Sequence, residues 1–442
     1  MKTSRTLQLS KPPADGAPAS TPGWTLWALS WADCLALGDG TSEDLLTASA
    51  AVDSVEDLTR PGVDVVAVLD PGMARLFRES AGSLFRGASP SQPWLTVLLP
   101  WREPPTRTIR RDGMVRSFCC SARVFSKALD NACSRQPESL CYCLMDQVMN
   151  GEVEVERLQV KQLPLRGPVE EPTTLAHDAA LIMAHRGPRS YLSAALGFLK
   201  RAEGASQLAM RVGLDVEDVS EYRDMISELA GVEFYQVDTP PVGPYVIRQA
   251  LIDRSREHAL VFHDSDDVSC YDRLTRLAAE IRDRQVEIVG SHELRLDELE
   301  RTVCAYRFPL DASAALGLPG STVRNDRGNE PLLHPTAMIV RSGMVRAGGF
   351  STDRKIANDT QFMLRAYFSL RMRNVDDFLY IRRRHSGALT VAKETALGIP
   401  LRKYLGSTWG AAFEAVRSGK AKLEETSLMP HLCPVPHTLT RL

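Results

Sequence analysis

Three carboxylates occur within four residues, at Asp264, Asp266 and Asp267, directly after the apolar run at 259–263. Placing such charges together costs free energy unless a cation compensates them. Hard divalent ions such as Mg²⁺ and Mn²⁺ take oxygen ligands of this kind and usually share them with substrate phosphates. The same residue types also suit a plain turn followed by a helix N-terminus. The position at the end of a buried strand favours a metal site.

The acidic cluster ends a segment in which short apolar runs alternate with helical patterns. Strands are predicted at 179–184, 207–213, 232–237 and 259–263, and helices at 191–202, 217–230 and 247–256. This alternation predicts βαβ units and a mainly parallel sheet, which places the chain in the α/β class. Ligands of such sheets bind at the carboxyl ends of the strands, where the acidic cluster and Asp215 both fall.

The N-terminal half carries its own series of elements. Strands are predicted at 63–69, 94–99 and 153–160, and helices at 122–131 and 139–149. The first residues hold a stretch rich in Pro, Ala, Ser and Gly, which indicates a disordered leader, and a Pro-rich stretch after residue 162 indicates a linker. We therefore expect a leader at 1–23, an N-terminal α/β domain at 24–166, a linker at 167–177, a second α/β domain at 178–390 and a helical C-terminal extension at 391–442.

The chain has 442 residues with 53 basic and 55 acidic side chains, so its charge nearly cancels. This balance argues against a protein whose main affinity is for nucleic-acid phosphates. Nine cysteines are too few for a disulfide scaffold and indicate buried free thiols in a reducing compartment. The longest apolar runs have five or six residues, far below the roughly 20 of a membrane-spanning helix. With no signal-peptide pattern, a cytoplasmic location is expected.

Residues 178–390, about half of the chain, resemble the inverting family 2 glycosyltransferases, which use nucleotide sugars and have the Rossmann-like GT-A fold. The motifs that carry the resemblance occur in the family's order. They are the first strand at 180–184, Asp215 after the second strand, the glycine and helix at 242–250, the sequence VFHDSDD at 261–267, the segment from His-Pro-Thr to Gly-Gly-Phe at 334–350, Asn358-Asp359 with Arg365, and the basic run and histidine at 380–385.

The resemblance implies that Asp266, together with Asp264 or Asp267, binds a Mn²⁺ or Mg²⁺ ion, with His385 as a further ligand. A histidine after an exposed basic run can equally be a plain surface residue. The ion would bridge the diphosphate of the donor, for which a UDP-sugar is expected. Asp215 is implied to contact the nucleoside, and its alternative is an ordinary loop carboxylate.

Three consecutive arginines, Arg382, Arg383 and Arg384, belong to the last motif. Guanidinium groups pair well with phosphate, and we take Arg382 and Arg384 as candidates to bind the donor diphosphate. Because basic runs are usually solvated, only one of the three is expected to reach the donor. Two histidines have open roles: His263 is expected to be a hydrogen-bonded core group, and His334 either faces the acceptor or ends a strand.

A single displacement needs one general base to take the proton of the attacking hydroxyl. The resemblance assigns this role to Asp359. The preceding residue is Asn358, where the family commonly has glutamate, but the second acid is the one usually assigned as the base. Asp359 would also suit the N-cap of a helix predicted at 360–370, where hydrogen bonding would lower its pKa.

The N-terminal half parallels the second domain at low identity, with residues 65–72 in the place of 260–266. We interpret residues 24–166 as a degenerate copy that keeps Asp70 but has no Asp-x-Asp-Asp, and that neither binds metal nor catalyses. The alternative is an unrelated α/β domain. The sequence as a whole predicts a metal-dependent inverting glycosyltransferase with an unknown hydroxyl acceptor. A catalytically silent scaffold of the same fold and a nucleotidyltransferase are the alternatives.

Overall fold

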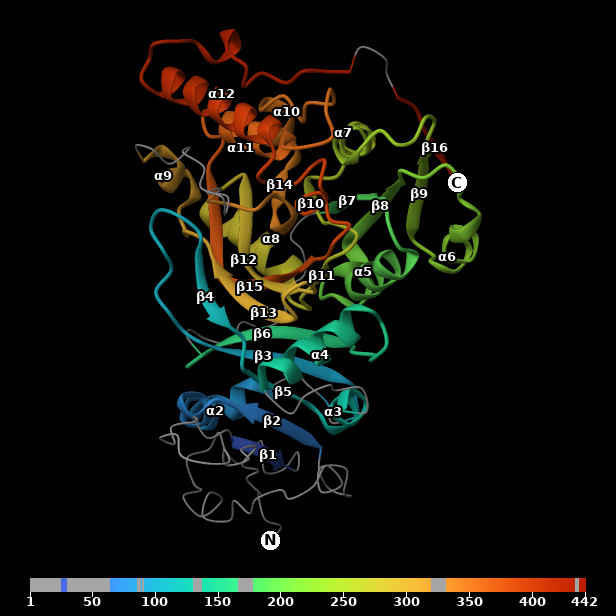
Figure 1. Cartoon of the computed structure of the whole chain (residues 1–442), viewed down its shortest axis with the longest axis vertical. Coiled ribbons are helices and arrows are strands. Elements are labelled where there is room, and N and C mark those ends of the chain that lie inside the picture. The colour runs from blue at the N-terminus through green and yellow to red at the C-terminus, as the bar shows by residue number, and fades with distance from the viewer. Residues whose placement is uncertain are drawn as a thin grey trace. The chain divides into compact units, whose positions relative to one another are not determined.

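The computed structural model describes residues 25–29, 64–85, 89, 91–129, 137–165, 178–318, 331–433 and 437–442, and its elements are labelled in Figure 1. The predicted leader at 1–23 and linker at 167–177 lie outside these residues. The chain forms two compact units. The first comprises Met1–Glu103, Gly113–Glu171 and Arg295–Ala305, and the second comprises Pro104–Asp112, Pro172–Leu294 and Tyr306–Leu442.

A five-stranded sheet in the order β1-β2-β5-β3-β6 forms the first unit. Its elements are β1 (Thr25–Leu29), β2 (Val65–Leu69), α2 (Pro71–Leu84), β3 (Trp94–Pro100), β5 (Ser117–Ser121), α3 (Ala122–Leu129), α4 (Pro137–Met149) and β6 (Arg157–Leu163). An aromatic core holds the sheet against α2, because the rings of Trp27, Phe77, Phe85 and Trp94 pack edge to face in sequence.

The strand predicted at 153–160 is wrong in its bounds. After α4, the carbonyl of Gln147 accepts hydrogen bonds from the amides of Glu152 and Val153, at 2.9 and 3.3 Å. This turn occupies the residues that alternate Val and Glu in the sequence, so β6 begins only at Arg157.

The second unit is built on a sheet in the order β11-β15-β12-β14-β10-β7-β8-β9-β16. Strands β10, β7, β8 and β9 are parallel neighbours, whereas β14 pairs antiparallel with both β10 and β12. The α/β class is therefore confirmed, with a mixed sheet instead of a mainly parallel one. The strands are β7 (Ala179–His185), β8 (Leu208–Leu214), β9 (Val232–Val237), β10 (Ala259–Phe262), β11 (Val268–Ser269), β12 (Ile288–Asp297), β14 (Met338–Val340), β15 (Met372–Arg384) and β16 (Leu439–Arg441); β4 (Arg110–Met114) and β13 (Thr302–Arg307) also occur in the chain.

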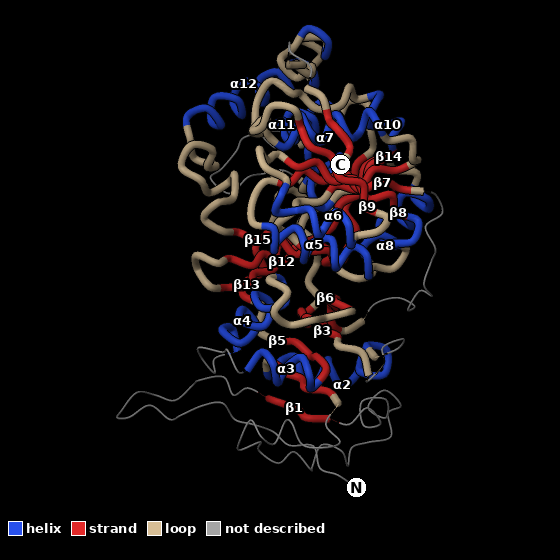
Figure 2. The backbone as a smooth tube through the Cα atoms, turned by 90° about the vertical axis from the view of Figure 1, so that its right-hand side faces the viewer, coloured by secondary structure: helices blue, strands red, loops and turns tan. Residues whose placement is uncertain are grey.

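Helices cover both faces of this sheet, as Figure 2 shows. Alternate residues of β7 point to opposite faces. Ala180 and Ile182 join the core under α7, α10, α11 and α12, while Leu181 and Met183 join the core under α5, α6 and α8. The helices are α5 (Arg189–Arg201), α6 (Arg223–Glu228), α7 (Pro244–Arg254), α8 (Arg273–Arg284), α9 (Ala312–Gly317), α10 (Arg341–Arg346), α11 (Asn358–Ala366) and α12 (Pro400–Arg417).

Two predicted helices begin three or more residues away from the observed start. The helix predicted at 217–230 is only α6, because the Asp218 carboxylate accepts hydrogen bonds from the amide and hydroxyl of Ser220 and closes a turn there. The helix predicted at 247–256 begins three residues earlier, at Pro244. Proline is favoured at the first helical position, and Gly243 before it has a φ of 92°.

The C-terminal extension is more than a helical tail. After α12, residues 427–429 run along α11, where Gln361 donates to the carbonyls of Ser427 and Met429 at 2.7 and 3.0 Å. The chain then adds β16 antiparallel to β9, with Leu439 opposite Val237. Within the described residues, every helix is too short or too polar to cross a bilayer.

The two units share part of their strand order. In the first unit β2, β5, β3 and β6 are consecutive neighbours, and in the second unit β10, β14, β12 and β15 are. Each set runs along the chain in the same order, with a helix after the first strand and two helices between the last two. The sheets differ beyond that set, because β1 pairs antiparallel with β2 whereas β7 pairs parallel with β10.

Candidate functional site

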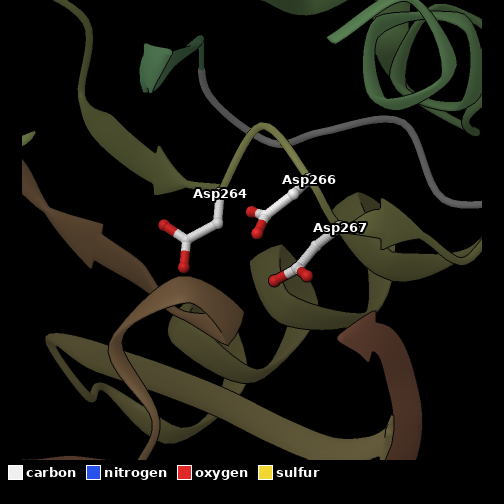
Figure 3. A group of neighbouring side chains, drawn as sticks. All are labelled: Asp264, Asp266 and Asp267. Carbon is white, nitrogen blue, oxygen red and sulfur yellow. The ribbon is translucent and has the colours of Figure 1, made fainter. Parts of the chain in front are cut away.

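The acidic cluster of Asp264, Asp266 and Asp267 lies on the turn that follows β10. Strand β10 is buried along its whole length and pairs parallel with β7. Because the turn follows β10, it lies at the carboxyl end of the parallel strands, where such sheets bind ligands. The amide of Asp267 donates to the carbonyl of Asp264 at 3.2 Å and closes the turn. The amide of Asp264 donates to the Tyr380 hydroxyl of β15 at 3.1 Å. Figure 3 shows the three carboxylates on one side of this turn.

Each of the three acids offers an oxygen, and these oxygens lie within 4.8 Å of one another. Asp267 is 1% exposed, and its Oδ1 accepts the amide of Arg383 at 2.7 Å. Its buried Oδ2 has no hydrogen-bond partner among the described residues. Burial, followed by the charges of Asp266 and Asp264, raises the pKa of Asp267 well above its usual range. A buried carboxylate oxygen of this kind suits a cation.

The other two acids already have partners. Asp264 forms an ion pair with Arg248 of α7, which is 5% exposed. Burial raises the pKa of Asp264 in spite of this pairing. Asp266 Oδ2 lies 3.0 Å from Nε2 of His385. Burial would raise the pKa of Asp266, but the hydrogen bond and charge of His385 outweigh it, and the pKa is lowered.

The structure thus brings the predicted His385 to the acidic cluster, while the three arginines before it alternate between the two faces of β15. Arg383 is buried, donates from Nε to the Asp266 carbonyl at 3.1 Å, and covers the ring of Tyr191 at 4.1 Å. Its side chain therefore supports the turn. Arg382 and Arg384 are half-buried and share the opposite face of β15. Burial lowers the pKa of Arg382, but nearby carboxylates, with Glu293 first, raise it above its usual range.

Asp215 lies at the end of β8 and is 4% exposed. Its two oxygens accept the amides of Val242 and Gly243, both at 2.9 Å. Asp215 therefore fixes the loop that leads into α7. The predicted contact with a nucleoside would use the lone pairs that these amides leave open.

Asp359 lies in the first turn of α11. The helix begins at Asn358 after Ala357, which has a φ of 63°, so the N-cap alternative for Asp359 is wrong. The carboxylate accepts the amide of Thr360 at 2.9 Å and a hydrogen bond from the Tyr245 hydroxyl of α7. Burial would raise its pKa, but His334, the Thr360 amide and other neighbours lower it. A deprotonated carboxylate is the form that a general base requires.

Asn358 has a structural role that explains why it is not glutamate. It is fully buried, and its Nδ2 donates to the carbonyls of Ser351 and Arg354 at 2.8 and 2.9 Å. A carboxylate has no N–H to donate. Asn358 therefore ties the loop before α11 to the helix that carries Asp359.

Both histidines with open roles are core groups. His263 and His334 are 0% and 1% exposed, and burial lowers the pKa of each to about 3. Both rings are therefore neutral at pH 7, and the His334 charge that acts on Asp359 exists only at acid pH. The ring of His263 packs on Tyr380 at 5.1 Å, and that of His334 packs on Phe262 at 4.3 Å. His334 is therefore buried in the core and does not face an acceptor from the surface.

Sequence reasoning missed three residues that hold the site together. Tyr245 and Arg248 lie one turn apart on α7 and contact Asp359 and Asp264, respectively. Their spacing of three residues, directly after the Gly243-Pro244 pair that opens α7, is the signal that was available. His185, at the end of β7, lies 2.8 Å from the hydroxyl of Ser265 in the acidic turn, and no sequence pattern indicates this contact.

Comparisons with known proteins identify no family. No family model and no curated protein matches the chain. Among solved structures, it is similar to Staphylococcus aureus TarS at 16% identity and a TM-score of 0.39, over 56% of this chain and 44% of that one. The TarS 1–349 fragment in complex with UDP-GlcNAc matches at 18% identity and a TM-score of 0.39, over 56% of this chain and 77% of that one. The matched region thus spans less than half of TarS.

Proposed function

We propose that the protein is an inverting glycosyltransferase of the GT-A type that resembles family 2. The observation that carries this proposal is the pair of carboxylate sites beside one helix. The acidic cluster is linked to α7 through Arg248, and Asp359 is linked to α7 through Tyr245. The acidic cluster suits binding of a nucleotide-sugar diphosphate through a metal ion, and Asp359 suits the role of a proton acceptor.

The acidic cluster fits a divalent ion. Three hard oxygen donors lie within 4.8 Å, and one buried oxygen of Asp267 has no partner among the described residues. Asp266 with Asp264 or Asp267 would hold Mn²⁺ or Mg²⁺, with His385 beside Asp266. Such an ion supplies charge neutralisation for the departing diphosphate.

The chain's own residues supply the remaining steps. Arg382 or Arg384 balances the diphosphate charge, and Asp215 contacts the nucleoside of a UDP-sugar. As the acceptor hydroxyl attacks the anomeric carbon, Asp359 takes its proton while the bond to the diphosphate breaks. One displacement inverts the anomeric centre and releases a nucleoside diphosphate. The expected location is the cytoplasm, which cell fractionation tests.

A thermal-shift panel of nucleotide sugars with Mn²⁺ tests the proposal. We expect one donor class to raise the Tm of the wild-type protein and of the control Asp283→Ala, whose carboxylate is exposed on α8. Asp266→Ala should lose the shift. Absence of any shift would favour a silent scaffold. Release of pyrophosphate in place of a nucleoside diphosphate would favour a nucleotidyltransferase.

A further inference from the structure

Tyr245 is the second residue of α7, and its hydroxyl hydrogen-bonds to Asp359 of α11. The side chain is 7% exposed. Its ring packs against Phe350 at 5.5 Å, and the Arg248 guanidinium lies 5.5 Å from the ring centre on the same helix. Phe350 in turn packs against Phe362 of α11 at 5.1 Å. Aromatic contacts therefore connect the start of α7 to the helix that carries Asp359.

The start of α7 is itself fixed. Asp215 accepts the amides of Val242 and Gly243, and Pro244 opens the helix directly after them. The backbone that carries Tyr245 is therefore held in place by hydrogen bonds.

We propose that Tyr245 is a positioning residue for Asp359, a role that rests on the proposed function of Asp359 as the general base. The hydroxyl of Tyr245 and the amide of Thr360 are two donors on one carboxylate. Together they set its rotation and leave lone pairs for the proton of the attacking hydroxyl. Tyr245 exchanges no proton with the substrate.

Removal of the hydroxyl has a defined effect on the pH profile. Tyr245 stabilises the ionised form of Asp359, so its loss raises the pKa of Asp359 and moves the acid limb of the rate profile to higher pH. The rate on the plateau above the acid limb, where it no longer changes with pH, reports orientation and not protonation. Other groups that interact electrostatically with Asp359 stay in place: His334, Arg402 of α12, Arg248 of α7 and Asp264 after β10.

The test is Tyr245→Phe, which removes one oxygen and keeps the ring. Tyr235→Phe is a matched control, because Tyr235 is 8% exposed and its hydroxyl donates to the Glu233 carboxylate at 3.0 Å on β9, outside the site. Release of UDP from UDP-sugars with Mn²⁺ is measured with water as the acceptor, from pH 4 to 8. For Tyr245→Phe we expect kcat at pH 7 to fall about tenfold, with the donor KM unchanged within about twofold and the acid limb raised.

The double variant Tyr245→Phe/Asp359→Asn separates positioning from general destabilisation. If Tyr245 acts through Asp359, the first change adds nothing to the second. A Tyr245→Phe protein whose kcat and pH profile match those of Tyr235→Phe overturns the positioning role and leaves the glycosyltransferase proposal intact. A wild-type protein that releases no UDP from any donor overturns the proposed function, and the role of Tyr245 with it.

Discussion

At the scale of single residues, Asp267 is a carboxylate whose charge conflicts with its burial. Its pKa is raised by burial and by the neighbouring acids, so the folded protein binds a proton that the unfolded chain releases. In the absence of metal, Asp267 therefore lowers the free energy of unfolding as the pH rises. The loss begins at roughly pH 4, the pKa of an aspartate in the unfolded chain, and continues up to the raised pKa in the folded protein.

We expect Asp267→Asn to stabilise the metal-free protein at pH 7, by about 1.4 kcal/mol for each unit by which the pKa is raised. The amide oxygen can still accept the Arg383 amide. The gain should shrink as the pH approaches 4, and Mn²⁺ should no longer raise the Tm. Melting curves at pH 5 and 7, with and without Mn²⁺, check this. The prediction would be contradicted if the Tm of the wild type and that of the variant changed equally between pH 5 and 7.

Asp359→Asn removes the proposed base and keeps the size of the side chain. We expect UDP release to fall at least about 100-fold, because proton acceptance is lost. The thermal shift with a UDP-sugar should persist, since the acidic cluster is unchanged. Asp353→Asn, on the loop before α11, is a control that should keep full activity. Retained activity in a folded Asp359→Asn protein would exclude Asp359 as the base.

The sequence indicated those site residues that depend on local order. The acidic cluster directly follows a strand-like run, and Asp359 directly precedes a helical pattern, so both positions follow from neighbours in the chain. Tyr245, Arg248 and His185 reach the site only through the packing of α7 and β7. One sequence does not fix such contacts between distant segments, although the spacing of Tyr245 and Arg248 places both side chains on one face of a helix.

At the scale of elements, Asn358 joins α11 to the loop before it. Asn358→Glu would remove the N–H donors to the carbonyls of Ser351 and Arg354 and place a charge in a fully buried position. We expect a loss of about 3 kcal/mol or more in unfolding free energy, measured by urea denaturation. The exposed control Asp353→Glu should lose little. A stable Asn358→Glu protein would refute this role of the Nδ2 donors.

Errors in predicted elements have local physical causes. The Asp218 turn shortened α6 because a side-chain acceptor competes with the helical hydrogen bonds. Strand β16 was not predicted because three residues are too few to show an alternating pattern, and its existence depends on the exposed edge of β9. By contrast, β7, β8 and β9 were placed to within one residue, since their apolar runs are long and bounded by turns.

At the scale of the whole molecule, the shared strand order supports the proposal that the first unit is a degenerate copy. If so, superposing β2-β5-β3-β6 on β10-β14-β12-β15 brings α2 onto α8 and α4 onto α11. A superposition that scatters these helices would favour an unrelated domain.

Asp70 provides a functional check of the same proposal. It follows β2, and its Oδ1 accepts the amide of Gly72 at 3.1 Å, as in an ordinary turn. We expect Asp70→Asn to leave both the Mn²⁺ shift and the donor shift unchanged, because a lone acid provides too few ligands for a divalent ion. Asp266→Ala serves as the comparison that should lose the thermal shift. If Asp70→Asn also lost the Mn²⁺ or the donor shift, the first unit would take part in binding.

Helix α7 has a kinetic consequence. Arg248 and Tyr245 stand one turn apart on α7, so a donor that brings a divalent ion to Asp264 would also shift the support of Asp359. The proton acceptor would then reach its working geometry only after the nucleotide sugar is in place. Steady-state inhibition patterns should accordingly be ordered: the donor enters first, the acceptor second, and the nucleoside diphosphate leaves last.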